Sequence, residues 1–413
     1  MTIHLNAKAA AIGMALLSAT LLNAPSAFAQ GQSNPRCDVT VTATGSSPSD
    51  SFAVNTAING PHTTAEVTVC LVGEFDFGTT DLVVIDPTAG APVPQIEELN
   101  ITGLDGATIV GGLQPLRFAG TSSLPRLSIT NLRFENPFVT AVSIFRSNEF
   151  VEISGIEIDG VQSLFVPAFG VTLREGITIT TAFAEIAGEV RIKDNLVDGG
   201  VFDSALDLTS VNSGIGLYGA FGAINPNPFS ANVLVSNNHV RNWSGSGIAA
   251  ISLNDARFEL NRIEPGAFGN QIPGGACAVP TGLGAAAGMS LTGIVDSTVL
   301  NNTIILTSAQ DGNGAAVCNA GIILLGNNGA ATSVSADNEF LGNIVTGAGR
   351  YAFVVGLDTS AAEQNNSFVG SNVSTFAPSG AHLFLGGGAN GNSFKGHYPS
   401  VEGNLAGNSI TGQ

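Results

Sequence analysis

The sequence predicts an all-β solenoid, in which short strands stack coil upon coil into parallel sheets. Three observations lead to this prediction: a six-residue phrase that recurs along the chain, a spacing of its copies that fits coils of roughly twenty-odd residues, and a strand-favouring composition. Charged residues make up only 11% of the chain, Gly, Val, Ile, Asn and Ser are abundant, and no long stretch has a convincing helical period. The composition therefore favours stacked sheet over helix.

The recurring phrase has the form apolar-x-polar-Asn-x-apolar, with an apolar residue in place of Asn in two copies. We interpret each copy as two short strands that meet at a corner. Asn suits a tight corner because it tolerates left-handed backbone, and because stacked Asn side chains can bond to one another along a solenoid axis. The copies span 129–134, 153–158, 192–197, 235–240, 258–263, 299–304 and 340–345, and five carry Asn at the corner: Asn195, Asn238, Asn261, Asn302 and Asn343.

The spacing of the corners indicates inserted loops. From Asn195 the corner residues advance by 43, 23, 41 and 41 positions. The short step fits one coil, and the longer steps fit a coil with an added loop. These loops cover roughly 198–213, 264–287 and 307–320, always between the third strand of one coil and the first strand of the next. We expect them to form a wall over one face of the solenoid, with a binding cleft beside it.

The first strand of each coil follows these loops and begins with Gly in most copies. The predicted strands span 214–219, 247–253, 288–293, 321–326, 351–356 and 381–386. Alternation along a strand places every second side chain inside. The predicted inward residues are Ile215, Leu217, Met289, Leu291, Ile322, Leu324, Leu383 and Leu385.

The N-terminus predicts a secretory signal peptide over 1–29. Lys8 precedes an apolar run from Ala9 to Leu22, and Ala27-Phe28-Ala29 supplies a small-x-small cleavage site. We therefore expect a secreted or periplasmic protein, and no later apolar stretch is long enough to span a bilayer. After the signal we expect an N-terminal cap over 30–66, the solenoid over 67–396 and a C-terminal tail or cap over 397–413.

The four cysteines predict disulfides, because an even number in an oxidising compartment usually pairs. Cys277 and Cys318 lie 16 residues past Asn261 and Asn302, so they occupy equivalent places in neighbouring coils. This favours a Cys277–Cys318 pair and leaves Cys37 with Cys70. The alternative is two or more free, buried thiols.

The net charge limits the partners. The chain carries a formal charge of −18, and removal of the predicted signal leaves 13 basic against 32 acidic residues, or −19. Such acidity argues against nucleic acid and anionic membranes as partners, since both require basic surface. It also disfavours a polyanionic glycan unless calcium bridges the charges. No cofactor is evident, His62, His239, His382 and His397 have no metal-ligand spacing, and the oligomeric state is left open.

The repeated phrases resemble those of right-handed parallel β-helix proteins, the pectate-lyase-like superfamily. The resemblance extends from about Val67 to Lys395. It implies a single-stranded right-handed parallel β-helix with loop insertions over one face, and an extracellular polysaccharide as partner. Because the superfamily includes lyases, hydrolases, epimerases, adhesins and phage tailspikes, the resemblance leaves the activity undecided.

The predicted first strands lack the charged groups that family chemistry requires. Their outward positions contain no carboxylate, Arg or Lys, namely at Gly216, Tyr218, Ser290, Thr292, Ile323, Leu325, Val354, His382 and Phe384. A lyase needs a base and a charge-stabilising cation, and a hydrolase needs two facing carboxylates. Of the polygalacturonase signatures only Arg191-Ile192-Lys193 is present, and chance or a salt-bridged outer strand explains it better than a catalytic role does.

The catalytic candidates are therefore loop aspartates, Asp203, Asp207 and Asp311. The candidates for substrate binding are Tyr218, His239, Arg241, Arg262, His382 and Phe384. Ordinary solvated surface is the alternative for the aspartates and for His239, Arg241 and Arg262, and cover by neighbouring loops is the alternative for His382 and Phe384.

Three functions follow from these observations. The first is an atypical polysaccharide lyase or glycoside hydrolase, and the second is a non-catalytic glycan-binding or adhesion solenoid. The third is an assembly protein that exposes an apolar patch around Ile323, Leu325, Val354 and Phe384.

Overall fold

The structure, a computed structural model, describes residues 36–85, 96–118, 124–145, 149–166, 171–180, 188–200, 210–219, 231–243, 245–264, 286–306, 319–326, 334–356 and 363–412. The chain divides into two units, Met1–Arg36 and Cys37–Gln413, and the second carries the fold. The predicted signal peptide, most of the predicted loop wall, and Asp203, Asp207, Asp311, Cys277 and Cys318 lie outside the described residues. These remain predictions.

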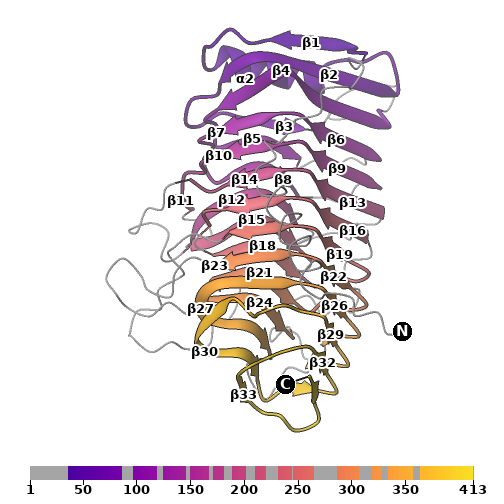
Figure 1. Cartoon of the computed structure of the whole chain (residues 1–413). Helices are drawn as coiled ribbons and strands as arrows, with labels where there is room; N and C mark the ends of the chain where they lie inside the picture. Colours follow the sequence, from indigo (N-terminus) through magenta and orange to yellow (C-terminus); the bar gives the residue numbers. More distant parts are fainter. Residues whose placement is uncertain are drawn as a thin grey trace, which may run out of the picture. The chain divides into compact units, whose positions relative to one another are not determined.

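The unit Cys37–Gln413 is a right-handed parallel β-helix, which confirms the predicted fold (Figure 1). One coil illustrates the plan. Strand β13 (Gly188–Lys193) leads through the Asn195 corner to β14 (Leu196–Asp198), and β15 (Ser210–Tyr218) follows after the inserted segment. Each strand pairs in parallel with its counterpart in the neighbouring coils, so the coils build three sheets.

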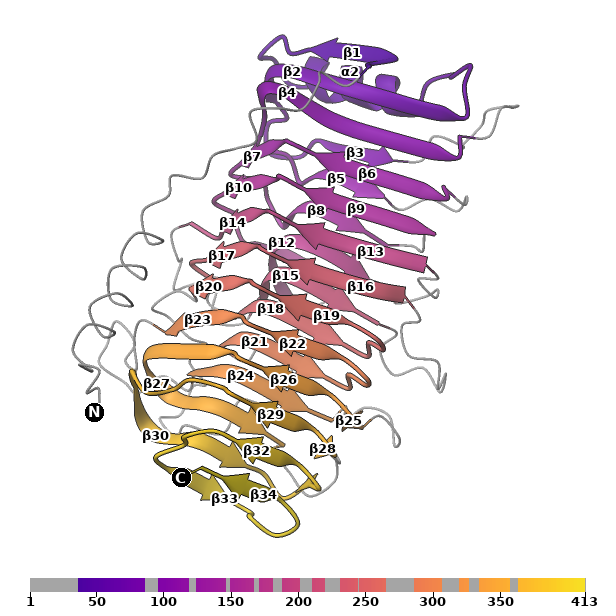
Figure 2. The same ribbon diagram turned by 45° about the vertical axis from the view of Figure 1, so that its right-hand side comes forward.

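We name the sheets after the strand order in a coil. The first-strand sheet consists of β3 (Leu82–Ile85), β5 (Gln114–Phe118), β8 (Thr140–Ile144), β12 (Val171–Thr180), β15, β18 (Ser246–Ile251), β21 (Ala286–Thr292), β24 (Asn319–Leu325), β27 (Ile344–Val355), β30 (Phe376–Leu385) and β33 (Val401–Gly403). The second-strand sheet, brought forward in Figure 2, consists of β1 (Val39–Thr42), β2 (Glu66–Asp76), β4 (Glu98–Val110), β6 (Arg126–Thr130), β9 (Phe150–Ser154), β13, β16 (Ala231–Ser236), β19 (Arg257–Glu259), β22 (Thr298–Leu300), β26 (Glu339–Leu341), β29 (Ser367–Val369), β32 (Ser393–Lys395) and β34 (Ser409–Thr411).

The third-strand sheet joins the end of β4 to β7 (Arg133–Glu135), β10 (Glu157–Asp159), β14, β17 (His239–Arg241), β20 (Arg262–Glu264), β23 (Thr303–Leu306) and the start of β27. Three further short strands, β25 (Ser335–Ala336), β28 (Glu363–Gln364) and β31 (Ala389–Asn390), form a small sheet. Strand β11 (Leu164–Val166) pairs antiparallel with β12.

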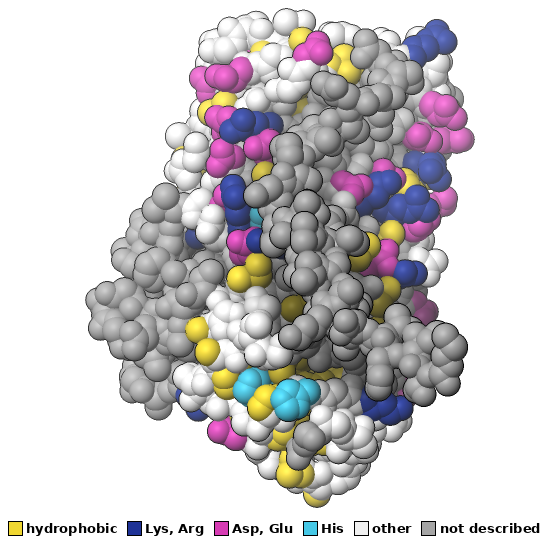
Figure 3. Space-filling model, viewed as in Figure 1, with side chains coloured by type: hydrophobic (Ala, Val, Ile, Leu, Met, Phe, Trp, Pro, Cys, Tyr) yellow, Lys and Arg dark blue, Asp and Glu magenta, His cyan; other side chains and the backbone are white. Residues whose placement is uncertain are grey.

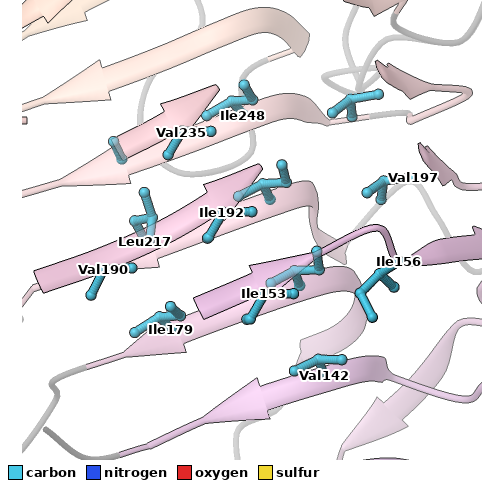
Figure 4. Packing of buried hydrophobic residues seen from close by; sticks show 14 of the residues in the cluster. Val142, Ile153, Ile156, Ile179, Val190, Ile192, Val197, Leu217, Val235 and Ile248 are labelled. Atoms are coloured by element: carbon cyan, nitrogen blue, oxygen red, sulfur yellow. The ribbon is translucent and has the colours of Figure 1, made fainter. Parts of the chain in front are cut away.

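The core runs through the inside of the coils. Ile192 aligns with Ile153 and Val235, and Ile179 aligns with Ile144 and Leu217, so equivalent side chains stack from coil to coil (Figure 4). All eight residues predicted to point inward are buried. Because each strand presents one apolar row to this interior, removal of these rows from water drives the stacking.

The glycines that begin the first strands have a steric reason. Gly214, Gly247, Gly288 and Gly321 occupy equivalent places, where the first strand meets the apolar side chains of the third strand. A Cβ added at Gly247 would lie 2.3 Å from Cγ2 of Ile263. Only glycine lets the two strands approach this closely.

The Asn corners form the predicted ladder, but their backbone differs from the expectation. The amide Nδ2 of each ladder residue donates to Oδ1 of the next, at 2.9–3.0 Å from Asn195 through to Asn343. The left-handed residue is the one before each ladder Asn, for example Asn237 with φ 53° and Asn301 with φ 52°. The ladder Asn residues are therefore held by buried hydrogen bonds and not by a tolerance for left-handed backbone.

A second ladder runs along another corner and was not predicted. It links Asn338, Asn366, Asn392 and Asn408 at 2.8–2.9 Å. The phrase does not include these residues, because they precede the second strand instead of following it.

The N-terminal end of the solenoid is closed by β1 and the helix α2 (Ser49–Asn59). No helical period in the sequence predicts this helix. Asp50 in its first turn accepts hydrogen bonds from the backbone N–H groups of Thr44, Gly45, Ser46 and Asp76. Burial alone would raise the pKa of Asp50, but hydrogen bonds led by those from Thr44 outweigh it and hold the pKa below 3.8.

The predicted Cys37–Cys70 disulfide is present and joins the cap to β2. Among the residues that the structure describes, no helix is long and apolar enough to cross a membrane.

Candidate functional site

A polar groove lies on the outward face of the second-strand sheet. It has a volume of about 360 Å³ and crosses β4, β6, β9 and β13. We call it the polar groove and define it by its lining residues, Glu98, Asn100, Arg126, Leu127, Ser128, Phe150, Glu152, Glu189 and Arg191. In Figure 3, basic and acidic side chains alternate over the right-hand edge of the molecule, where Figure 1 labels β6, β9 and β13.

Strand alternation and parallel register bring these residues together. Glu98 aligns with Arg126, Arg126 with Phe150, and Phe150 with Glu189. A second outward row, two positions further along each strand, aligns Asn100, Ser128, Glu152 and Arg191. Neighbouring strands lie about 4.8 Å apart, so each row presents one side chain per coil along the solenoid axis.

Phe150 stands between two guanidinium groups. The guanidinium carbon of Arg126 lies 4.3 Å from the centre of its ring, and that of Arg191 lies 5.4 Å away. Guanidinium groups pack well on aromatic faces, and the contact restricts their rotation. The groove therefore contains a stack of three planar groups from three successive coils.

Both arginines of the groove, and Lys193 beside it, pair with carboxylates of the groove. Arg126 Nε lies 3.1 Å from Glu98, Arg191 Nε lies 2.5 Å from Glu189, and Lys193 Nζ lies 3.1 Å from Glu152. The Arg191-Ile192-Lys193 tripeptide is thus part of a salt-bridged outer strand, the alternative that the sequence left open. Alternating donors and acceptors on an open surface suit a ligand that is rich in hydroxyl groups.

The described residues contain no group of three or more His, Cys, Asp or Glu side chains that could hold a metal ion. Calcium stays the bridging ion that the sequence left open for an anionic glycan.

The outward face of the first-strand sheet contains a buried acid that the sequence analysis missed. Glu175 on β12 is 7% exposed, and Thr178 Oγ1 donates to its Oε2 at 2.8 Å. Burial raises the pKa of Glu175 above 4.5, although hydrogen bonds from Thr178, Tyr218 and Thr140 partly offset this effect. The expectation that the outward positions of this sheet carry no carboxylate is therefore wrong at Glu175.

The predicted series of first strands begins only at Gly214, although Gly176-Ile177-Thr178-Ile179 has the same Gly-apolar-x-apolar start and is the signal that could have placed 171–180 in the series. Pairing of Glu175 with Thr140 and Ser213 in the neighbouring strands establishes its place. The adjacent Arg174 is also buried. It donates to the carbonyl groups of Val161 and Gly199 and lies 5.5 Å from the ring of Trp243.

Tyr218, a predicted binding residue, belongs to this buried cluster. Its hydroxyl group lies 2.8 Å from Ser213 Oγ and bonds to Glu175. Burial, and then the negative charge of Glu175, raises the pKa of Tyr218 well above 10.0. Tyr218 is only 7% exposed, so it does not line an open cleft.

His239, Arg241 and Arg262 lie together on the third-strand sheet, away from Tyr218. His239 Nε2 lies 3.0 Å from Glu264, Arg262 Nε lies 2.5 Å from the same carboxylate, and Arg241 Nε lies 2.6 Å from Asp198. Burial would raise the pKa of Glu264, but hydrogen bonds and charges from Arg262 and His239 lower it below 4.5. All three candidates therefore have carboxylate partners within the protein.

His382 and Phe384 lie near the C-terminal end of the first-strand sheet. His382 is 8% exposed, and its Nδ1 lies 2.8 Å from Ser400 Oγ. Burial is the main cause that lowers its pKa below 6.5. Phe384 packs on Tyr351, at 5.2 Å between ring centres.

The apolar patch proposed for an assembly protein is buried. Ile323, Leu325 and Val354 are 0%, 6% and 0% exposed and form a small cluster with Tyr351 and Phe384. The structure thus separates the predicted binding residues between two sheets and does not join them into one site.

Comparisons with known proteins give fold-level likeness. No family model matches the chain, and no curated protein matches it. Among solved structures, the catalytic unit of a GH87 α-1,3-glucanase from Streptomyces thermodiastaticus strain HF3-3 is 15% identical, with a TM-score of 0.46 over 92% of this chain and 70% of that chain. An alginate lyase from Paenibacillus sp. str. FPU-7 is also 15% identical, with a TM-score of 0.43 over 85% of this chain and 99% of that chain.

A DFA-IIIase from Arthrobacter chlorophenolicus A6 is 13% identical, with a TM-score of 0.45 over 89% of this chain and 95% of that chain. At such low identity the likeness concerns the parallel β-helix alone.

Proposed function

We propose that this chain is an exported protein that binds an extracellular polysaccharide in the polar groove. The observation that carries the proposal is the stack of Phe150 between Arg126 and Arg191, bordered by the carboxylates of Glu98, Glu152 and Glu189. Binding sites usually combine an apolar contact with a few placed polar groups. The half-buried ring holds the two guanidinium groups in place and leaves part of its apolar surface for the ligand, and the paired ions supply donors and acceptors for sugar hydroxyl groups.

Export is supported by the disulfide between Cys37 and Cys70. Disulfides persist in oxidising compartments and are rare in the cytosol. The predicted signal peptide over 1–29 agrees with this inference.

A binding assay tests the proposal. Affinity electrophoresis against a panel of soluble polysaccharides should reveal retardation of the wild type, and Phe150→Ala and Arg126→Ala should weaken binding at least about tenfold, or about 1.4 kcal/mol. Arg257→Ala is the matched control. Arg257 lies on the same sheet and pairs with Glu259 at 2.5 Å, but it is not part of the groove. Equal loss in Arg257→Ala would assign the effect to general surface charge and contradict the proposal.

Polysaccharide cleavage is a second candidate function, and Glu175 is the observation that favours it. A carboxylic acid whose pKa is raised by burial can act as a proton donor, and it lies on the sheet where the family resemblance leads us to expect chemistry. Size-exclusion analysis of the same polysaccharides after incubation would detect shortened chains. If Glu175→Gln cleaves as fast as the wild type, Glu175 is not the acid.

A further inference from the structure

We infer that the polar groove selects uncharged glycans and holds their chains along the solenoid axis, so that each chain crosses β4, β6, β9 and β13. This inference rests on the proposed function, because it names the class of ligand for the same groove. It depends on three features of the described residues: the pairing of charges, the order of donors and acceptors along the solenoid, and the planar stack at Phe150.

The charges of the groove are already balanced by one another. Glu98, Glu189 and Glu152 each lie within 3.1 Å of a cation, Arg126, Arg191 and Lys193 respectively. A sugar carboxylate or sulfate that binds the remaining N–H groups of an arginine would lie beside the resident glutamate, which is paired with Nε of the same guanidinium. Like charges at such short range repel each other, so the groove disfavours an anionic glycan.

The ends of the groove strengthen this preference. At one end Glu98 aligns with Glu66 on β2, which adds a further carboxylate. At the other end Glu189 aligns with Asn232 and Arg191 with Leu234 on β16, where no cation follows. Acidic groups thus outnumber the cations near the groove, on a chain whose net charge is already −18.

The glutamates of the groove do not repel the hydroxyl groups of an uncharged sugar. A hydroxyl group donates one hydrogen bond and accepts others, so it can bridge a carboxylate oxygen and a guanidinium N–H without separating the pair. The exposed parts of the pairs allow this, because the side chains of Arg126, Glu98, Arg191 and Glu189 are 50%, 32%, 39% and 39% exposed.

The planar stack gives the ligand a direction. Arg126, Phe150 and Arg191 come from β6, β9 and β13, so their contacts follow one another along the solenoid axis. The four strands of the groove span three inter-strand steps, or about 14 Å. A short stretch of an extended glycan chain that runs across the strands would therefore meet each pair in turn.

The experiment measures binding of oligosaccharides of matched length at low and high salt. The neutral probes are malto-, cello-, manno- and fructo-oligosaccharides, and the anionic probes are oligogalacturonate and oligomannuronate. We expect the wild type to bind a neutral probe with an affinity that changes less than about twofold with salt, because no net charge is neutralised.

A variant that lacks two carboxylates of the groove gives a second test. The double substitution Glu98→Gln with Glu189→Gln frees both arginines, so it should weaken the neutral probe and gain affinity for a uronate, with a strong salt dependence. The same change at Glu259 and Glu339, on the second-strand sheet outside the groove, is the control and should leave both affinities unchanged.

The outcomes separate the two claims. Tighter binding of a uronate than of every neutral probe by the wild type, lost in Arg126→Ala, would overturn the selectivity and leave the proposed function standing. Failure of the wild type to bind any probe or polysaccharide would overturn the proposed function itself.

Discussion

Leu260 occupies a backbone position where its neighbours in the stack carry Asp, Asn or Gly. Its φ is 56°, in the left-handed region, and its side chain is 57% exposed. The equivalent residues before the other ladder positions are Asp194, Asn237, Asn301 and Gly342. A leucine gains no local hydrogen bond there, whereas Asn237 donates to Asp194 at 2.6 Å. Leu260 therefore interrupts an outer row of polar side chains.

Replacement of this leucine should stabilise the protein. Left-handed backbone costs an ordinary residue about 1–2 kcal/mol and costs Asn less, so we expect Leu260→Asn to raise the free energy of unfolding by about 0.5–1 kcal/mol. Chemical denaturation provides the measurement. Leu405, which is 52% exposed and has no left-handed backbone, is the control. An equal gain in Leu405→Asn would attribute the effect to lost surface hydrophobicity instead.

Glu175 predicts a pH dependence of stability. Because its pKa in the folded protein is raised above 4.5, its contribution is fully present below that pH and is lost as the pH rises through the folded pKa. Gln cannot ionise and can still accept hydrogen bonds from Thr178 and Tyr218. We therefore expect Glu175→Gln to gain stability relative to the wild type as the pH rises, by up to about 1.4 kcal/mol per pH unit.

Thermal unfolding from pH 4 upward tests this, with substitution of Glu402, an exposed glutamate of the last coil, as the comparison. A difference between Glu175→Gln and the wild type that does not change with pH would show that the pKa of Glu175 is not raised in the folded protein.

At the scale of the element, the Asn ladder is the main polar structure of the interior. Asn261 is 1% exposed and forms hydrogen bonds with the ladder residues of both neighbouring coils. Its Nδ2 donates to Val235 O and to Asn302 Oδ1, both at 2.9 Å, and its Oδ1 accepts from the amide Nδ2 of Asn238. Loss of the side chain would leave several buried groups without partners.

We expect Asn261→Ala to lower the free energy of unfolding by about 3 kcal/mol or more, since each buried unsatisfied group costs about 1–3 kcal/mol. Asn408 ends the second ladder and is only partly buried, so water can replace its partners. Asn408→Ala should therefore cost about 1 kcal/mol or less. Urea denaturation compares the two, and equal losses would argue against the burial of the ladder as the cause.

Strands could be predicted where the sequence repeats. Elements in non-repeating segments were missed. The recurring phrase identified the second and third strands and the ladder from Asn195 to Asn343. The phrase does not cover first strands, and the Gly-apolar-x-apolar start of β12 at Gly176 was not recognised as one of their series, so Glu175 was missed. Helix α2 was missed because its eleven residues make too short a pattern, and because its position depends on Asp50 and the end of the stack.

The polar groove could not be predicted from spacing along the chain. Its members come from four strands, and their grouping depends on the parallel register that sets Phe150 between Arg126 and Glu189. An outward charge in a single strand gives no sign of this register. The sequence did indicate that Arg191 and Lys193 lie on an outer strand. Of the groove itself, only the place of Arg191 was predicted in this way.

At the scale of the whole molecule, the N-terminal cap closes the first open edge of the stack. The Cys37–Cys70 bond fixes β1 to β2, across a sequence separation of 33 residues. A crosslink over this separation restricts the unfolded chain by about 3–4 kcal/mol. The disulfide therefore stabilises the first coil, which packs against another coil on one side only.

We expect the double substitution of Cys37 and Cys70 by Ala to loosen the cap before the rest of the solenoid. Hydrogen exchange should become faster in β1 and the start of β2, while the amides of β13 to β24 keep their protection. The same double substitution at Cys277 and Cys318, whose pairing remains a prediction, should leave the cap unchanged. Uniform acceleration along the whole chain after loss of Cys37 and Cys70 would show that the cap and the stack unfold as one unit.

The one-way order of the Asn ladder has a consequence for how such a chain can change over generations. Each interior ladder amide, at Asn238, Asn261 and Asn302, donates an Nδ2 hydrogen to the ladder Asn of the next coil and accepts one from the coil before. Each interior coil thus offers an amide donor to one neighbouring coil and an amide acceptor to the other. Duplication or loss of a coil as a whole would leave every remaining amide with a partner, whereas a partial one would not. The coil is therefore the natural unit of inheritance in this molecule, and its length can drift in whole coils while the groove near one end is kept.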